Sequence, residues 1–293
     1  MDGILLMAYG TPSTLEDVDA YYTDICGGIR PTEERIDNLK SKYLAIGGTS
    51  PLYQITEKQA AKLERALSGK AKVYFGMKHS YPFIKDAVKK ASKDGVTRLL
   101  CIALAPHNSV TGLGSYFKGV EDANNNLNEK LEIIFIHSWN LSDALISCWS
   151  ENIRNTVNPK NTFMIFSAHS LPEGAESNGV YKKELLETAN AIAEKLGINH
   201  WELAFQSQSS RGEKWYGPTI KETISSGFTD WEEISIAPIG FISDNLEILY
   251  DIDIECKNWA KEKSIYLKRI SMPNDSSLLI EALRDLVEEY LLK

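Results

Sequence analysis

The chain has 293 residues, of which 43% are hydrophobic, and a formal net charge of −8 at neutral pH. This length and apolar content suit one large or two ordinary globular domains, so we expect a folded globular protein. The acidic charge argues against a general binder of nucleic acid or of anionic membranes, because such proteins need a basic footprint.

The cysteines and the N-terminus indicate where the protein works. Cys26, Cys101, Cys148 and Cys256 stand singly and far apart, which is typical of reduced thiols in a cytoplasm. Residues 1–8 lack a basic n-region, and their apolar run is too short for a signal peptide. No apolar run reaches membrane-spanning length. We therefore expect a cytoplasmic protein without a transmembrane segment or a nucleic-acid partner.

Short apolar runs alternate with longer amphipathic ones along the chain. In the first half we predict strands over 4–8, 72–76, 98–105 and 132–137, and helices over 15–25, 33–44, 56–67, 82–92 and 114–127. In the second half we predict strands over 162–167, 200–206, 233–238 and 265–269, and helices over 182–196, 218–226, 243–262 and 275–292.

This alternation of strands and helices predicts an α/β fold with two Rossmann-like lobes, each a parallel sheet flanked by helices. We assign residues 1–145 to the N-terminal lobe and 146–274 to the C-terminal lobe, and we expect the last helix, 275–293, to pack back on the first lobe. Ligands of such sheets bind at the carboxyl ends of the strands. The active site is therefore expected in the cleft between the lobes.

The predicted helix 243–262 carries an acidic stripe. At about 100° per residue, Asp244, Glu247, Asp251 and Glu255 fall within an arc of about 80°. The ordinary interpretation of such a stripe is the solvated face of an amphipathic helix. However, like charges one turn apart repel, and no lysine stands at the interleaved positions to relieve them. A divalent cation is therefore the second interpretation.

His169 follows an apolar strand in the segment Ser167-Ala168-His169-Ser170. The rule of carboxyl ends places this histidine at the cleft, where a neutral imidazole can accept a proton or bind a borderline cation. A structural histidine is equally consistent with these residues. The neighbouring serines could suggest a hydrolase, but the sequence lacks a G-x-S-x-G elbow, a P-loop and a glycine-rich dinucleotide motif. Hydrolase, kinase and dehydrogenase functions are therefore disfavoured.

Aromatic and basic residues give weaker signals. Several tyrosines could line a flat apolar slot, although each alone is more typical of core packing: Tyr9, Tyr43, Tyr53 and Tyr116. The most basic stretch could bind ligand carboxylates, although a solvated helix face is its default interpretation: Arg30, Arg35, Lys40 and Lys42.

Nine short motifs follow one another along nearly the whole chain: residues 6–12 (LMAYGTP), 21–25 (YYTDI), 43–52 (YLAIGGTSPL), 77–79 (MKH), 104–107 (LAPH), 167–173 (SAHSLPE), 206–207 (QS), 215–218 (WYGP) and 238–256. In this order they resemble the ferrochelatases, and within that family the short, soluble bacterial type that acts on coproporphyrin III. The resemblance implies a two-lobed Rossmann-like fold and a lyase that inserts Fe²⁺ into a porphyrin in haem biosynthesis, with release of two protons. Coproporphyrin III is the favoured substrate and protoporphyrin IX the alternative.

The resemblance also implies what accompanies this activity. Fe²⁺ is a substrate, and no cofactor is expected to be bound permanently. An iron–sulfur cluster is not expected, because no cysteine-bearing extension follows the last helix. A monomer is expected, with a transient iron donor or haem acceptor as partner.

The resemblance assigns roles to residues at matching positions. His169 and Glu247 match the catalytic pair that faces the metal and the pyrrole nitrogens, and Asp251 and Glu255 match outer acids that hold a hydrated divalent cation on a partly widened helix. Metalation must strip water from Fe²⁺ and take protons from the macrocycle, so an imidazole and a carboxylate suit it. The expected porphyrin-binding residues are Tyr9, which matches a tyrosine axial to the iron, and Lys42, Tyr43, Ser50, Tyr116, His79 and Trp215.

Some positions depart from the family pattern. Cys26 stands where an arginine is usual, and Lys42 replaces a second arginine, although a lysine cannot make the same bidentate contact to a carboxylate. Asn245 replaces a histidine, Phe205 a tryptophan and Gln208 an acid. Carboxylate recognition is therefore the property that these departures affect most.

Two other functions remain open. A cobalt chelatase of the same superfamily is one, although the contexts of Tyr9 and of Asn245-Leu246-Glu247 favour the iron enzyme. A non-catalytic porphyrin or haem carrier is the other. Tight porphyrin binding without a spectral change that depends on Fe²⁺ would indicate the carrier.

Overall fold

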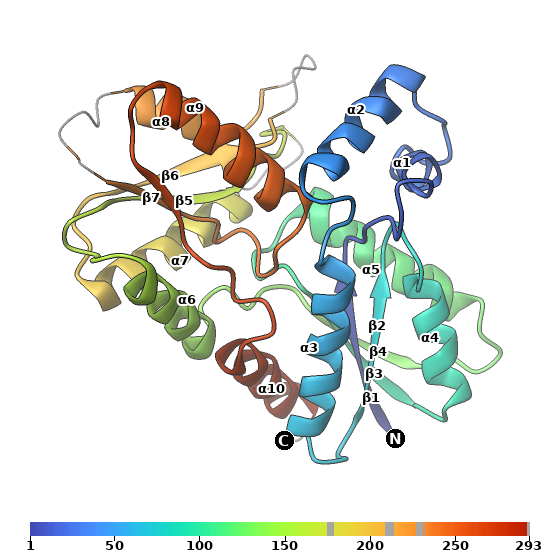
Figure 1. Ribbon diagram of the computed structural model, residues 1–293. Helices are drawn as coiled ribbons and strands as arrows, with labels where there is room; N and C mark the ends of the chain where they lie inside the picture. The colour runs from blue at the N-terminus through green and yellow to red at the C-terminus, as the bar shows by residue number, and fades with distance from the viewer. Residues whose placement is uncertain (175–178, 209–213, 227–230, 232, 292–293) are drawn as a thin grey trace.

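A computed structural model describes residues 1–174, 179–208, 214–226, 231 and 233–291 of the chain. Within these residues two parallel four-stranded sheets form, with strand orders β2-β1-β3-β4 and β6-β5-β7-β8 (Figure 1). The first lobe comprises β1 (Asp2–Ala8), α1 (Val18–Ile25), α2 (Glu33–Ala45), α3 (Leu52–Ala66), β2 (Lys72–Met77), α4 (Ile84–Lys93), β3 (Arg98–Ala103), α5 (Val110–Asn125) and β4 (Glu132–Ile136).

The second lobe follows α6 (Asp143–Thr156). Its elements are β5 (Phe163–His169), α7 (Val180–Leu196), β6 (Trp201–Gln206), α8 (Ile220–Ser225), β7 (Ile234–Ala237), η1 (Ile248–Cys256), α9 (Lys257–Glu262), β8 (Leu267–Arg269) and α10 (Ser277–Leu291). The predicted α/β fold with two lobes of parallel sheet is confirmed. Residues 292–293, which the predicted last helix included, lie outside the described residues.

The strands at the centre of each sheet explain this agreement. In β1 the residues Ile4 to Met7 are all fully buried, as expected for an apolar run in a sheet that is covered on both faces. Leu5 and Met7 pack with α4 and α5 on one face, whereas Ile4 and Leu6 belong to a core that continues into the second lobe. The two lobes therefore share buried apolar surface.

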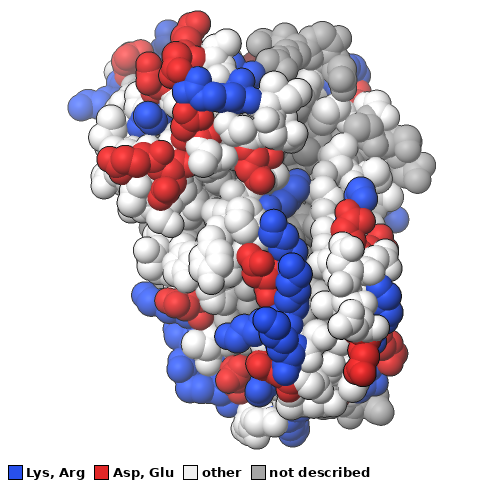
Figure 2. Space-filling model, turned by 90° about the vertical axis from the view of Figure 1, so that its right-hand side faces the viewer, with Lys and Arg blue, Asp and Glu red and all other residues white. Residues whose placement is uncertain are grey.

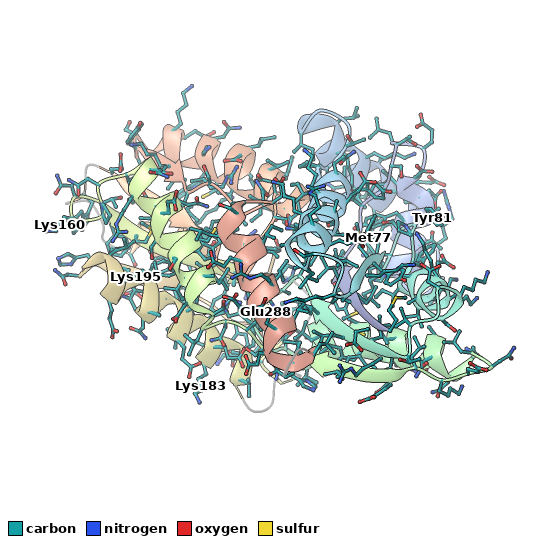
Figure 3. The ribbon with its side chains drawn as sticks, turned by 90° about the horizontal axis from the view of Figure 1, so that it is seen from below. Met77, Tyr81, Lys160, Lys183, Lys195 and Glu288 are labelled. Carbon is teal, nitrogen blue, oxygen red and sulfur yellow. The ribbon has the colours of Figure 1, made fainter. Side chains whose placement is uncertain are left out.

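The C-terminal helix α10 completes this shared core. It packs against α6 and also against α3 of the first lobe, and Figure 3 shows it, with the labelled Glu288, between the two halves of the molecule. Its buried face includes Leu279, Leu283 and Val287. Among the described residues, no helix is long and apolar enough to cross a membrane.

The predicted helix over 243–262 is partly widened, as the resemblance implies. The chain from Ile248 to Cys256 forms a π-helix, and only Lys257–Glu262 continues as α9. In η1 the backbone hydrogen bonds join residues i and i+5, which widens each turn. Side chains four residues apart therefore lie close to one face of this helix. A pattern measured against the ordinary 3.6-residue period cannot reveal this widening.

Gly240, which precedes η1 in the chain, packs against the end of β5. Its amide donates to the carbonyl of Ser167 at 3.1 Å. A Cβ atom at Gly240 would lie 2.5 Å from the Cβ and 2.8 Å from the Cα of Ala168. Real atoms do not approach so closely, so only glycine allows this segment to lie against β5 next to His169.

We expect Gly240→Ala to destabilise the fold by about 1–3 kcal/mol, because overpacking must push the strand or the segment apart. Gly114→Ala is the matched control, since a Cβ there meets open space on α5. Alanine in a helix should leave stability unchanged or raise it by about 0.5–1 kcal/mol. Denaturant unfolding of both variants measures this, and equal stability of the two would contradict the packing argument.

Candidate active site

His169 is the last residue of β5, and its ring is held by the backbone that follows. Nδ1 donates to the carbonyl of Ser170, while the backbone carbonyl of His169 accepts from the Tyr181 hydroxyl at 3.1 Å. With the proton on Nδ1, the neutral ring carries its lone pair on Nε2. Nε2 lies 3.6 Å from Oε1 of Glu247. The lone pair and the carboxylate therefore face the same space.

Glu247 stands just before η1 and brings a carboxyl group with altered acidity. Burial raises its pKa, and the nearby charge of Asp251 raises it further, while His169 and Lys42 oppose the shift. Such a carboxyl group exchanges protons closer to neutral pH than an ordinary glutamate does. The structure thus brings together His169 and Glu247, from two elements far apart in the sequence.

The wide helix η1 aligns Glu247 with two further acids, Asp251 and Glu255. The Ser207 hydroxyl lies 2.6 Å from Oδ2 of Asp251 and 3.5 Å from Oε2 of Glu247, so it can link the first two carboxylates. Ser207 has a φ of 59°, a left-handed conformation that costs a residue with a Cβ about 1–2 kcal/mol. The carboxylates of Glu247, Asp251 and Glu255 thus follow one another at intervals of four residues, and Glu247 lies nearest to His169.

The pairing of these acids corrects one sequence inference. The stripe has basic partners after all, because lysines from elements distant in sequence fold against it. Asp251 pairs with Lys42 at 3.5 Å, and Glu255 pairs with Lys221 at 2.6 Å. Repulsion along the helix therefore does not by itself require a cation.

Asp244 departs from the predicted stripe. Its carboxylate contacts Arg269 at 3.2 Å and accepts from the Asn274 side chain at 2.8 Å. These contacts lie before η1 begins, where they fix the start of the helical segment. We therefore assign Asp244 to the scaffold.

Tyr9 follows β1 and faces the acids from the first lobe. Its side chain is 42% exposed, and burial, followed by the charge of Glu247, raises its pKa. Its ring lies 4.7 Å from that of His79, edge to face. Nδ1 of His79 lies 2.7 Å from a carboxylate oxygen of Asp24. Sequence reasoning missed Asp24, whose only signal was its place in the Tyr21–Ile25 motif.

The remaining predicted porphyrin contacts are more enclosed. The Tyr43 hydroxyl lies 3.3 Å from Oγ1 of Thr11, and burial raises its pKa to about 12. The Ser50 hydroxyl accepts a hydrogen bond from the Leu52 amide at 3.3 Å, at the start of α3. Tyr116 is only 8% exposed. In the described part of the chain the buried indole nitrogen of Trp215 has no hydrogen-bond partner.

Most cations of the predicted basic stretch are already paired. Arg30 contacts Asp19 at 2.6 Å, and Arg35 donates to the Tyr22 hydroxyl at 2.7 Å. Lys42 reaches across to η1, where its ammonium also lies 4.8 Å from the centre of the Tyr250 ring. The stretch therefore holds its own surroundings together.

The site does not include a closed metal cage within the part of the chain that the structure describes. No three His, Cys, Asp or Glu side chains converge there closely enough to hold an ion. His169 and Glu247 offer one nitrogen and carboxylate oxygens on the same space. A metal ion held by such a pair keeps coordination positions open for another ligand.

Comparisons with known proteins agree with this chemistry. Residues 1–291 match the family model described as Ferrochelatase. A ferrochelatase from Herpetosiphon aurantiacus is 37% identical, with 97% of each chain covered. A coproporphyrin III ferrochelatase from Listeria monocytogenes is 40% identical, covering 98% of this chain and 97% of the relative.

Solved structures show the same fold at low identity. SirB from Bacillus subtilis with Fe³⁺ superposes with a TM-score of 0.62 at 12% identity, covering 98% of this chain and 94% of that one. CbiX, described as the terminal enzyme of sirohaem biosynthesis in denitrifying bacteria, gives 0.60 at 10% identity, with 99% of each chain covered. Their likeness establishes a two-lobed chelatase fold. Together with the sequence match over nearly the whole length, it shows that this chain belongs to the ferrochelatase family of metal chelatases.

Proposed function

We propose that this protein inserts Fe²⁺ into coproporphyrin III, with His169 and Glu247 as the pair that handles the metal and the pyrrole protons. The observation that carries the assignment of this pair is the position of His169 Nε2, 3.6 Å from Oε1 of Glu247. The coproporphyrin assignment is supported by relatives of that name at about 40% identity.

The reaction has two requirements that these groups meet. Two protons must leave the pyrrole nitrogens, and Fe²⁺ must exchange its water for those nitrogens. The Nε2 lone pair of His169 can take a pyrrole proton or receive the iron. Glu247 serves the complementary role, and its raised pKa suits a group that must accept a proton and then release it.

The acids along η1 extend this site. We propose that Asp251 and Glu255 hold a hydrated divalent cation, as hard carboxylate oxygens favour. Each acid has a lysine partner, Lys42 and Lys221 respectively. An arriving cation would replace these ammonium groups as the counter-charge. The Ser207 hydroxyl then links Asp251 to Glu247 and so to the reacting centre.

The central test is anaerobic Fe²⁺ insertion followed by absorbance, with coproporphyrin III and protoporphyrin IX compared. We expect turnover with coproporphyrin III and a fall of about 100-fold or more in His169→Ala, since positioned acid–base groups contribute factors of that order. His200→Ala is the matched control, because His200 is exposed and lies just before β6, whereas His169 pairs with Gln206 at the other end of that strand.

Wild-type rates in His169→Ala would overturn the assigned pair. Binding of both porphyrins without turnover would indicate a carrier, and insertion of cobalt into a different tetrapyrrole would indicate another chelatase. Faster turnover of protoporphyrin IX would change the substrate and leave the pair intact.

The pH dependence tests the role of Glu247. If Glu247 acts as a carboxylate, the rate falls as the pH drops through its raised pKa. Asp251→Asn removes a like charge that raises this pKa, so the acid limb of the rate profile should move to lower pH, by up to about one unit. Asp253→Asn is the control on the same helix, since Asp253 pairs with Arg269. An unmoved limb, or a shift to higher pH, would contradict this role.

A further inference from the structure

Lys78 occupies a place on the first-lobe wall that the proposed chemistry leaves unused. It follows β2, and its amide donates to the Ala8 carbonyl at 2.9 Å, while the His79 amide donates to the Tyr9 carbonyl at 3.0 Å. These bonds continue the β1–β2 pairing past the end of the sheet. They fix Lys78 beside Tyr9, on the wall that faces Glu247.

The ammonium group of Lys78 contacts aromatic faces. Nζ lies 5.6 Å from the ring centre of Tyr9 and 5.6 Å from that of Tyr116. The side chain is partly buried, and burial lowers its pKa, opposed only by the charge of Asp24. That carboxylate is engaged with His79 at 2.7 Å. In the described residues Nζ has no ion pair or hydrogen bond, and the two ring faces partly compensate for the hydration that burial removes.

Two other cations on this side of the site already have anionic partners. Lys42 pairs with Asp251, and Arg30 with Asp19. Further lysines lie on the outer surface: Figure 2 faces the side of the molecule on which α4 lies and shows a row of basic side chains down it. Lys93, at the end of α4, is exposed. Lys78 thus lies beside Tyr9 without an anionic partner among the described residues.

We infer that Lys78 binds a carboxylate of the porphyrin and so contributes to selection of a carboxylated macrocycle; this inference rests on the proposed function. The partly exposed Tyr9 ring offers a flat apolar surface to the macrocycle, and the ammonium beside it meets an acidic side group at the macrocycle's edge. A carboxylate of the porphyrin next to Lys78 supplies the counter-charge that this lysine lacks among the described residues. A charge-assisted hydrogen bond forms, stronger than one between neutral groups.

The test compares two probes that share a macrocycle: coproporphyrin III, which carries carboxylates, and its tetramethyl ester, which is uncharged. Equilibrium binding is measured by porphyrin fluorescence in the same detergent buffer for wild type, Lys78→Gln, Lys78→Arg and the charge-matched control Lys93→Gln. We expect Lys78→Gln to weaken coproporphyrin III binding about tenfold or more. Lys78→Arg and Lys93→Gln should stay within about threefold of wild type, and ester binding should be alike in all four proteins.

Two outcomes would overturn the inference alone. One is wild-type affinity of Lys78→Gln for coproporphyrin III. The other is an equal loss for acid and ester, which would show that the lysine only shapes the wall. If the wild type binds neither probe, the porphyrin assignment itself fails and this inference fails with it. Iron insertion by the wild type, measured in parallel, separates these cases.

Discussion

The site depends on a close contact between two backbone segments, in which Gly240 lies against Ala168. This contact has no room for a Cβ atom, and the Gly240 amide bonds to the carbonyl of Ser167. It brings the end of β5, with His169, against the segment that leads into η1, with Glu247. Across these two segments the imidazole and the carboxylate lie 3.6 Å apart. Because packed backbone cannot shift freely, this contact limits how far the polar pair can move apart.

Around this pair, charge is distributed so that the inner groups remain available. The outer acids Asp251 and Glu255 are balanced by lysines, whereas Glu247 faces an imidazole and carries a raised pKa. Across the cleft, Lys78 lies over aromatic rings without a carboxylate of its own. In the proposed function, one wall supplies the groups for the metal and the protons, and the other supplies a cation beside an aromatic ring. The proposed substrate, a carboxylated macrocycle with a metal-binding centre, complements both walls.

The agreement between sequence and structure is uneven for physical reasons. His169 was placed at the cleft by the rule of carboxyl ends, and that rule depends only on strand order along the chain. Ser207, Lys78 and Asp24 were missed because their partners are remote in sequence: Ser207 contacts Asp251, and Asp24 contacts His79. Of the predicted acidic stripe, Asp244 is bound by Arg269 and Asn274 as part of the scaffold, and Asp251 and Glu255 are neutralised by Lys42 and Lys221 from other elements.

Local patterns in the sequence alone determined the alternation of strands and helices, the two parallel sheets and the positions of the candidate histidine and acids. They did so because burial and period are properties of neighbouring residues. Only the tertiary structure decided that His169 faces Glu247 and which partner each charged side chain has. Distances between side chains and access to water arise when remote segments pack together, and these set both pKa values and the groups left free to bind.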